Sequence, residues 1–258
     1  MSLPSGDPTK RFTSRVDAYV AARPAYPDEI ATLLARELSL PRGATVADIG
    51  CGTGLSCVPF LRAGFAVIGV EPNDAMRAAG EKFLAGQGNF RSVAAKAEAT
   101  TLADASVDLI VAAQAAHWFD MPHARAEALR ILRRPAWAAL IWNDRVSTGS
   151  PLAEGYEALM QEFGVEYEKI RHRHGPESTV TPYFGHTEYR EARITNVTSL
   201  DLPTLVARVG SSSYMPQPDA PTYAPMIAKL RQLFETSAQG GKVTIDYITR
   251  VFFGAVGP

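Results

Sequence analysis

The sequence predicts an α/β fold, a largely parallel sheet with helices on both of its faces. Between residues 44 and 144, five apolar segments of strand length alternate with segments of helical periodicity. In such an alternation each helix returns the chain to the same edge of the sheet, so consecutive strands run parallel. The apolar segments contain few polar residues, as expected for strands that are buried on both faces.

The expected elements of this region follow in chain order. Strands are predicted within residues 44–50, 65–71, 89–99, 106–114 and 136–144. Helices are predicted within residues 55–64, 73–86 and 121–134. The second helix begins at Asn73 or Asp74, because both residue types cap helix N-termini. Pro59 falls inside the first helix, where it removes a hydrogen bond unless it lies in the opening turn.

The two ends of the chain carry further elements. Before the alternation, residues 30–38 place apolar side chains at helical spacing, after a proline-rich break at residues 23–27. After residue 150, helices are predicted within 152–170 and 222–238, and strands within 189–201 and 241–255. Because no linker separates these parts, we expect a single domain divided into residues 1–40, 41–146 and 147–258.

Composition and charge exclude several functional classes. The chain has 258 residues, 46% of them hydrophobic, and no apolar run approaches the ~18 residues of a membrane span. A net charge of −1 provides no field that would attract nucleic acid. The only cysteines, Cys51 and Cys57, flank a glycine loop and do not resemble a disulfide framework. The first residues lack the apolar core of a signal peptide, so we expect a cytoplasmic protein.

A glycine loop follows the first predicted strand, in the stretch "TVADIGCGTGLS". Gly50, Gly52 and Gly54 permit positive φ and let a ligand approach the backbone closely. Glu71 lies 21 residues after Gly50 and ends the second strand, where a carboxylate can accept hydrogen bonds from both hydroxyls of a ribose. The combination predicts a cofactor that contains adenosine.

Two residues distinguish between such cofactors. Dinucleotide-binding loops follow the pattern G-x-G-x-x-G, which would require glycine at position 55, where this chain has Leu55. Asp48 precedes the loop and would repel a pyrophosphate, whereas it would attract the ammonium group of a methionine. The pattern therefore favours S-adenosylmethionine, and an NAD(P)-dependent oxidoreductase stays as the alternative.

Longer stretches resemble a known family. "VADIGCGTG" and "VIGVEPNDAM" resemble the first two motifs of class I S-adenosylmethionine-dependent methyltransferases. Residues 94–120 and 127–145 are similar to later motifs of the methyltransferase type 11 family, a small-molecule branch similar to trans-aconitate methyltransferases. The resemblance implies a Rossmann-like, doubly wound seven-stranded mixed sheet whose last strand is antiparallel. It also implies an N-terminal helical lid and a helical insertion in the C-terminal half.

The resemblance assigns cofactor contacts to individual residues. Asp48 and the three glycines would hold the methionine side, and Glu71 with Pro72 the ribose. Met76 would pack on the adenine face, although a methionine at helical spacing is equally often an ordinary core residue. The loop after the third strand would bind the adenine edge through Ala97 and Glu98, unless Glu98 is simply a solvated loop carboxylate. Gln114 would contact the methionine portion.

The resemblance also implies an acceptor side. His117 and Trp118 would face the substrate, and His117 is the candidate base because its ordinary pKa suits proton removal at neutral pH. In the lid, Tyr19, Arg23 and Tyr26 would contact substrate or cofactor. The alternatives are packed residues at a helix start for the first pair and a surface cap for the lid.

The implied reaction is an in-line transfer of methyl from the sulfonium to a small-molecule acceptor. A carboxylate acceptor needs no base, whereas a hydroxyl needs one. A protein that binds S-adenosylmethionine without catalysis is a further alternative. A nucleic-acid methyltransferase is disfavoured, because exocyclic amines require D/N-P-P-Y/F where this chain has "QAAH". The acceptor and the oligomeric state stay open.

Two other stretches have an unusual composition. "KIRHRHG", residues 169–175, could bind an anion or be solvated, and a metal site using His172, His174 and His186 is disfavoured because no acid or cysteine accompanies them. The family carries a Pro-Gly-Gly turn before its fifth strand, where this chain has "RRPAWAAL". We therefore expect that turn to be built differently, or Trp137 to point inward.

Overall fold

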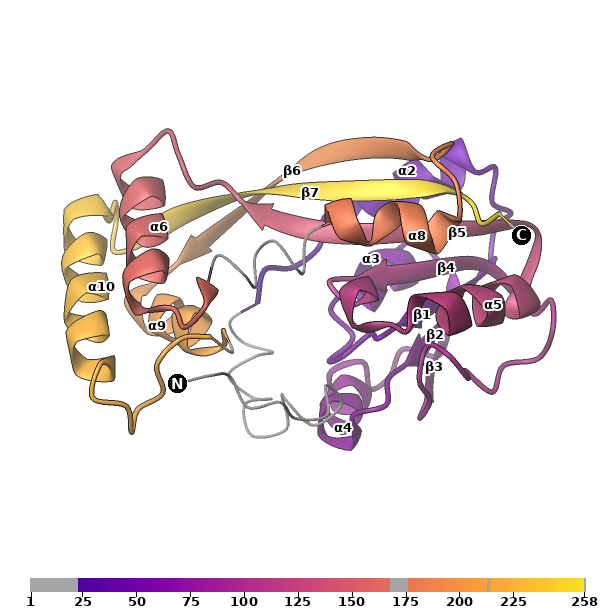
Figure 1. Ribbon diagram of the computed structural model, residues 1–258, viewed down its shortest axis with the longest axis horizontal. Helices are drawn as coiled ribbons and strands as arrows, with labels where there is room; N and C mark the ends of the chain where they lie inside the picture. The colour runs from indigo at the N-terminus through magenta and orange to yellow at the C-terminus, as the bar shows by residue number, and fades with distance from the viewer. Residues whose placement is uncertain (1–22, 168–175, 213, 258) are drawn as a thin grey trace. The chain divides into compact units, whose positions relative to one another are not determined.

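The computed structural model describes residues 23–167, 176–212 and 214–257. Its sheet has seven strands in the order β3-β2-β1-β4-β5-β7-β6 (Figure 1). The strands are β1 (Thr45–Ile49), β2 (Ala66–Val70), β3 (Phe90–Val93), β4 (Val107–Ala113), β5 (Leu132–Arg145), β6 (Arg190–Leu200) and β7 (Val243–Ala255). The predicted seven-stranded mixed sheet is confirmed.

The first five strands are parallel, as the alternating sequence predicts. In the central pairings Val46 of β1 lies beside Val67 of β2 and beside Leu109 of β4. β7 runs antiparallel to β5, since Val146 donates to the carbonyl of Asp246 while Val256 donates to that of Ala136. The predicted strand 241–255 is thus a single long strand, and helices separate it from β6.

The helices and short 3-10 turns lie between the strands in chain order. They are α2 (Glu29–Glu37), α3 (Cys57–Arg62), α4 (Asp74–Phe83), η3 (Ala116–Trp118), α5 (Met121–Ile131), α6 (Pro151–Phe163), η4 (Pro176–Ser178), α8 (Val180–Phe184), α9 (Leu202–Gly210) and α10 (Tyr223–Ser237). Asn73 caps α4 by accepting a hydrogen bond from the Met76 amide, as predicted. Pro59 is the third residue of α3, in the opening turn where its missing N–H is tolerated.

Both faces of the parallel sheet are buried, which explains its uninterrupted apolar strands. Val46 and Val67 point to one face, where they pack with Leu34 of α2 and Phe60 of α3. Their neighbours Ala47 and Ile68 point to the other face, and that cluster includes Ile131 of α5 and Phe184 of α8. Because successive side chains in a strand alternate between faces, every position of these strands must be apolar.

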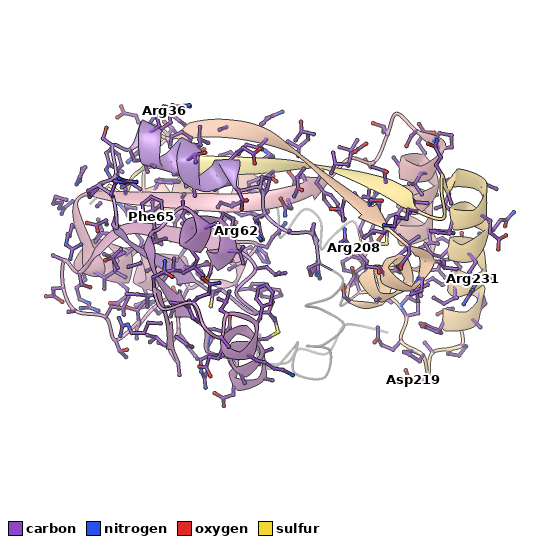
Figure 2. All side chains as sticks on the ribbon, turned by 180° about the vertical axis from the view of Figure 1, so that it is seen from behind. Arg36, Arg62, Phe65, Arg208, Asp219 and Arg231 are labelled. Atoms are coloured by element: carbon purple, nitrogen blue, oxygen red, sulfur yellow. The ribbon has the colours of Figure 1, made fainter. Side chains whose placement is uncertain are left out.

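The described residues form two compact units. One, the sheet unit, contains residues 25–143, 176–194 and 249–257, and it carries the glycine loop. The other, the helical unit, contains residues 23–24, 144–167, 195–212 and 214–248. Its own core joins Leu159 of α6, Leu205 of α9 and Leu230 of α10, and Arg208 of α9 donates a hydrogen bond to the Tyr247 hydroxyl at 2.9 Å (Figure 2).

The turn before β5 differs from the family pattern, as expected. β5 begins directly after α5, and the pairing with β4 shifts register between Val107 and Leu109, so that Trp137 lies opposite Leu109. Ala136 has a φ of +68°, a conformation that the family's glycines would adopt easily. Trp137 packs, half-buried, against the core on the α2 and α3 side. No helix in the described parts of the chain is long and apolar enough to cross a membrane.

Candidate functional site

The glycine loop connects β1 to α3 at the carboxyl edge of the parallel strands, where open α/β sheets bind ligands. Gly50, Gly52 and Gly54 have φ values of +72°, +56° and +80°. A Cβ at Gly50 would lie 2.7 Å from the Cβ of Ala115, and one at Gly54 would lie 2.7 Å from Leu84 Cδ1. The loop therefore needs glycine for its backbone conformation and for its close packing.

Asp48 is the last but one residue of β1 and is fully buried. Its Oδ2 accepts hydrogen bonds from Ser56 Oγ at 2.5 Å and from Cys57 Sγ at 3.2 Å. Its Oδ1 is buried and has no hydrogen-bond partner among the described residues. Burial raises the pKa of Asp48 to about 6, against the lowering effect of these two hydrogen bonds.

Glu71 follows β2 and is 8% exposed. Its Oε2 accepts a hydrogen bond from the Gly52 amide at 2.9 Å, and its Oε1 accepts one from the Asn73 amide at 2.8 Å. Burial raises the pKa of Glu71, while the two amide hydrogen bonds lower it. Each carboxylate oxygen can accept a second donor, so Glu71 holds the loop and retains capacity for ligand hydroxyls.

Helix α4 packs tightly on the glycine loop. A Cβ at Gly80 would lie 3.2 Å from the Gly52 carbonyl oxygen, so the helix and the loop are nearly in backbone contact. Met76, only 5% exposed, places its Cε 3.2 Å from the position of a Cβ on Gly52. Pro72 is half-buried between Glu71 and this helix. Met76 is thus both a packed residue and a neighbour of the loop.

The loop after β3 is tied to the segment that carries His117. Glu98 Oε1 accepts a hydrogen bond from the Asp120 amide at 2.8 Å, so its carboxylate has a structural partner. Ala97 packs, half-buried, against the core. The buried Glu127 of α5 holds the same loop by accepting from the Thr100 amide at 2.8 Å.

Gln114 follows β4 in a left-handed conformation, with φ of +53°. Such a φ is uncommon for a residue with a side chain and often marks a functional position. Gln114 Nε2 donates a hydrogen bond to the Asn143 carbonyl at 3.3 Å, which links the ends of β4 and β5. His117 and Trp118 lie in η3 immediately beyond, half-buried, with ring centroids 5.0 Å apart.

The predicted lid residues do not come together as a group. Tyr26 packs beside α2 in the sheet unit. Arg23 belongs to the helical unit, where its Nη2 donates to the Ser211 carbonyl at 3.4 Å. Tyr19, His172 and His174 lie outside the described residues. His186 contacts the Ala255 carbonyl through Nε2 at 3.0 Å, and the described residues contain no cluster of metal-ligating side chains.

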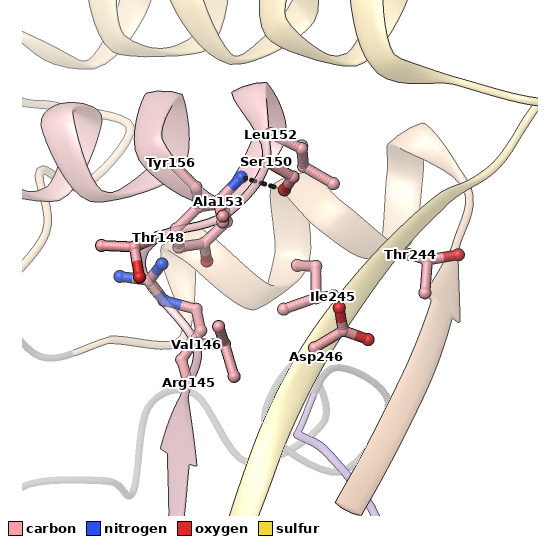
Figure 3. Close-up of a pocket in the computed structure, with 11 residues that line it drawn as sticks. Arg145, Val146, Thr148, Ser150, Leu152, Ala153, Tyr156, Thr244, Ile245 and Asp246 are labelled. Carbon is pink, nitrogen blue, oxygen red and sulfur yellow. Dashed lines mark hydrogen bonds between the residues drawn. The ribbon is translucent and has the colours of Figure 1, made fainter.

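The helical unit contains a small cavity of about 60 Å³ between the start of α6 and β7 (Figure 3). Arg145 lies on one side of it, forms an ion pair with Glu157 and places its guanidinium 4.4 Å from the Tyr156 ring centroid. Since Glu157 balances Arg145 and Asp246 adds a second carboxylate, the cavity has no excess of positive charge for an anion.

Sequence reasoning did not predict the residues that hold Asp48. Ser56 and Cys57 lie eight and nine residues after it, across the loop, and no local pattern assigns them to its carboxylate. The signal available in the sequence was a hydroxyl residue at the start of a helix, which ordinarily indicates an N-cap. Here the Ser56 side chain makes no capping hydrogen bond and contacts Asp48 instead.

Comparison with known proteins places these features in a wider group. Residues 47–140 match the family described as a methyltransferase domain. An uncharacterized methyltransferase of Mycobacterium tuberculosis is 30% identical over 257 residues, which cover 96% of this chain and 97% of that protein. A protein of Dictyostelium discoideum, also named a methyltransferase, is 34% identical over 146 residues, or 55% of this chain and 53% of that one.

Solved structures share the fold. A structure described as a type II methyltransferase from Anaeromyxobacter dehalogenans aligns with a TM-score of 0.68 at 20% identity. The alignment covers 92% of this chain and 99% of that one. At this level of identity the similarity concerns the arrangement of strands and helices.

Proposed function

The chain belongs to the methyltransferase family of these relatives, and on that premise we propose that it takes the methyl group from S-adenosylmethionine. The observation that carries the proposal is the pair of buried carboxylates, Asp48 and Glu71, on either side of a loop that only glycine can form. A bound S-adenosylmethionine supplies a methyl group already activated by a positively charged sulfur. The residues of the chain then have to bind, orient and exclude water.

The charges of the loop support this cofactor over a dinucleotide. Glu71 acts on Asp48 as a second negative charge and raises its pKa, so a pyrophosphate would meet two carboxylates at the loop. An ammonium group would instead offset both charges and give Asp48 Oδ1 a partner. We propose that Asp48 binds the methionine ammonium, directly or through water.

The remaining contacts follow the order of the strands. Glu71 would accept hydrogen bonds from the ribose hydroxyls, because both of its oxygens have acceptor capacity beyond the amides of Gly52 and Asn73. Met76 and Pro72 would border the adenine beside the loop, and Ala97 would offer backbone groups to its edge. Glu98 would act by holding that loop through Asp120.

On the acceptor side, Gln114 would orient the methionine portion and His117 would remove a proton. Gln114 is held by Asn143 in a conformation that packing must maintain, which suits a positioning role. His117 follows β4 at the carboxyl edge, where an acceptor hydroxyl could reach it. We propose a small-molecule acceptor with a carboxylate or hydroxyl group, as in trans-aconitate methyltransferases, with Trp118 and the lid residues Tyr19, Arg23 and Tyr26 contributing to selection.

Isothermal titration calorimetry with S-adenosylmethionine and, separately, NADH tests the cofactor. We expect S-adenosylmethionine to bind and NADH to give no heat. Glu71→Gln should weaken binding at least tenfold, because a neutral amide is a poorer acceptor for two hydroxyls. Glu81→Gln on α4, whose side chain is 52% exposed, is the matched control and should bind as the wild type does.

A screen of small carboxylic acids, phenols and amines then tests the acceptor. Release of S-adenosylhomocysteine identifies a substrate whichever of its atoms accepts the methyl group. Turnover on at least one member of these classes would support the proposal. Binding of S-adenosylmethionine with turnover on no small molecule would overturn the acceptor assignment and leave the cofactor assignment intact.

A further inference from the structure

The two oxygens of Asp48 have different surroundings. Both of its donors, Ser56 and Cys57, approach Oδ2 from the start of α3, at 2.5 Å and 3.2 Å. Oδ1 is buried as deeply and has no partner among the described residues. The carboxylate is therefore anchored through one oxygen and presents the other with its lone pairs unused.

The two donors are well suited to an ionised carboxylate. Ser56 is 5% exposed and Cys57 is fully buried, so neither side chain can exchange its partner for bulk water. A hydrogen bond with Cys51, together with burial, raises the pKa of Cys57 well above its usual range, so the thiol keeps the proton that it donates. A hydrogen bond to an ionised acceptor is stronger than one to a neutral acceptor.

Other groups around Asp48 act in the opposite direction. Burial is the largest influence and raises its pKa, and the charge of Glu71 raises it further. Cys51 lies within electrostatic reach, since Asp48 in turn raises the pKa of Cys51. The titratable groups that face Asp48 are thus Glu71, Cys51 and Cys57, all of them acids. Ionisation at neutral pH depends on the donors at Oδ2.

We propose that Ser56 and Cys57 are positioning residues that keep Asp48 ionised and leave its Oδ1 available to the ammonium group of the cofactor. This inference rests on the proposed function, because it concerns how the same site recognises S-adenosylmethionine. Neither residue needs to touch the ligand. Their effect on binding is transmitted through the protonation state of one carboxylate.

The test is the pH dependence of S-adenosylmethionine affinity, measured by calorimetry between pH 5.5 and 7.5. Loss of one hydrogen bond to a charged group shifts a pKa by about one unit. If only ionised Asp48 binds, Ser56→Ala should weaken binding about fivefold relative to the wild type at pH 6. At pH 7.5 the same variant should bind within about 1.3-fold of the wild type.

Cys57→Ser gives the opposite sign and guards against a folding defect. A hydroxyl is a stronger donor than a thiol and fits the same space, so the binding midpoint should stay or move to lower pH. Ser106→Ala is the control, because its exposed hydroxyl bonds only to the Ala103 carbonyl, and it should follow the wild-type curve. The Asp48 carboxyl pKa, measured by carbon NMR without ligand, should rise in Ser56→Ala.

The outcomes separate the inference from the function on which it rests. If wild-type protein binds no S-adenosylmethionine at any pH, the proposed function fails, and the ligand-free NMR titration still decides whether Ser56 and Cys57 control Asp48. If the wild type binds but Ser56→Ala weakens binding equally at pH 6 and pH 7.5, or leaves the Asp48 pKa unchanged, the inference is overturned and the function stands.

Discussion

Replacement of Asp48 by asparagine should stabilise the ligand-free protein as the pH rises. Asp48 is fully buried with a pKa of about 6, against about 3.9 in an unfolded chain. The unfolded state therefore loses its proton first, and the wild type loses stability as the pH rises through this window. The full difference is about 3 kcal/mol, of which about 2 kcal/mol falls between pH 4.5 and 7.5.

Asparagine removes this titration with little change of shape. Its carbonyl oxygen can accept the hydrogen bonds of Ser56 and Cys57, while its amide occupies the place of Oδ1. Any constant cost of the amide cancels when two pH values are compared. The expected result is that Asp48→Asn gains about 2 kcal/mol of unfolding free energy relative to the wild type from pH 4.5 to pH 7.5.

Urea unfolding followed by circular dichroism at both pH values measures this difference. Asp219→Asn, at an exposed aspartate, is the control and should show the same offset from wild type at each pH (Figure 2). The same Asp48→Asn protein should lose affinity for S-adenosylmethionine, so that a more stable protein binds less well. An offset that does not change between pH 4.5 and 7.5 would refute the argument from burial.

Three further predictions concern other parts of the site. Gly54→Ala should destabilise the protein by more than about 1 kcal/mol beyond Gly43→Ala, as measured by urea unfolding, because both have positive φ but only Gly54 meets a side chain, that of Leu84, at 2.7 Å; equal losses would contradict this. Partners lower the pKa of Glu127 to about 2, Arg130 first among them, so its contribution to stability is present above pH 4.5 and is lost as the pH falls towards 2. Glu127→Gln should lose on the order of 1 kcal/mol at pH 7 in the same assay, a figure reduced for solvent screening, and the deficit should shrink in acid. His117→Ala should slow turnover of a hydroxyl acceptor at least a hundredfold with unchanged cofactor affinity, and unchanged turnover in a steady-state assay would remove it from the base role.

The sheet and the glycine loop could be predicted because their signals are local. A strand buried on both faces must be apolar at every position, and Gly50, Gly52 and Gly54 mark a backbone that other residues cannot adopt easily. Asn73 was recognisable as a cap for the same reason, since a cap bonds within its own turn.

Contacts between segments distant in sequence could not be predicted in the same way. Glu98 bonds to the Asp120 amide, 22 residues later, so a single sequence could not distinguish it from a solvated carboxylate. The donors to Asp48 depend on how the loop turns back onto β1. Helix α9, which begins with Asp201 as its N-cap, was not predicted, because its nine residues are too short for helical periodicity to be decisive.

A crystal structure with S-adenosylhomocysteine tests the central claim most directly. The account predicts the ribose hydroxyls on Glu71, the amino group on the Oδ1 side of Asp48, and the homocysteine backbone along Gly50, Gly52 and Gly54. A ligand bound elsewhere, or a loop that admits a dinucleotide in its place, would contradict it.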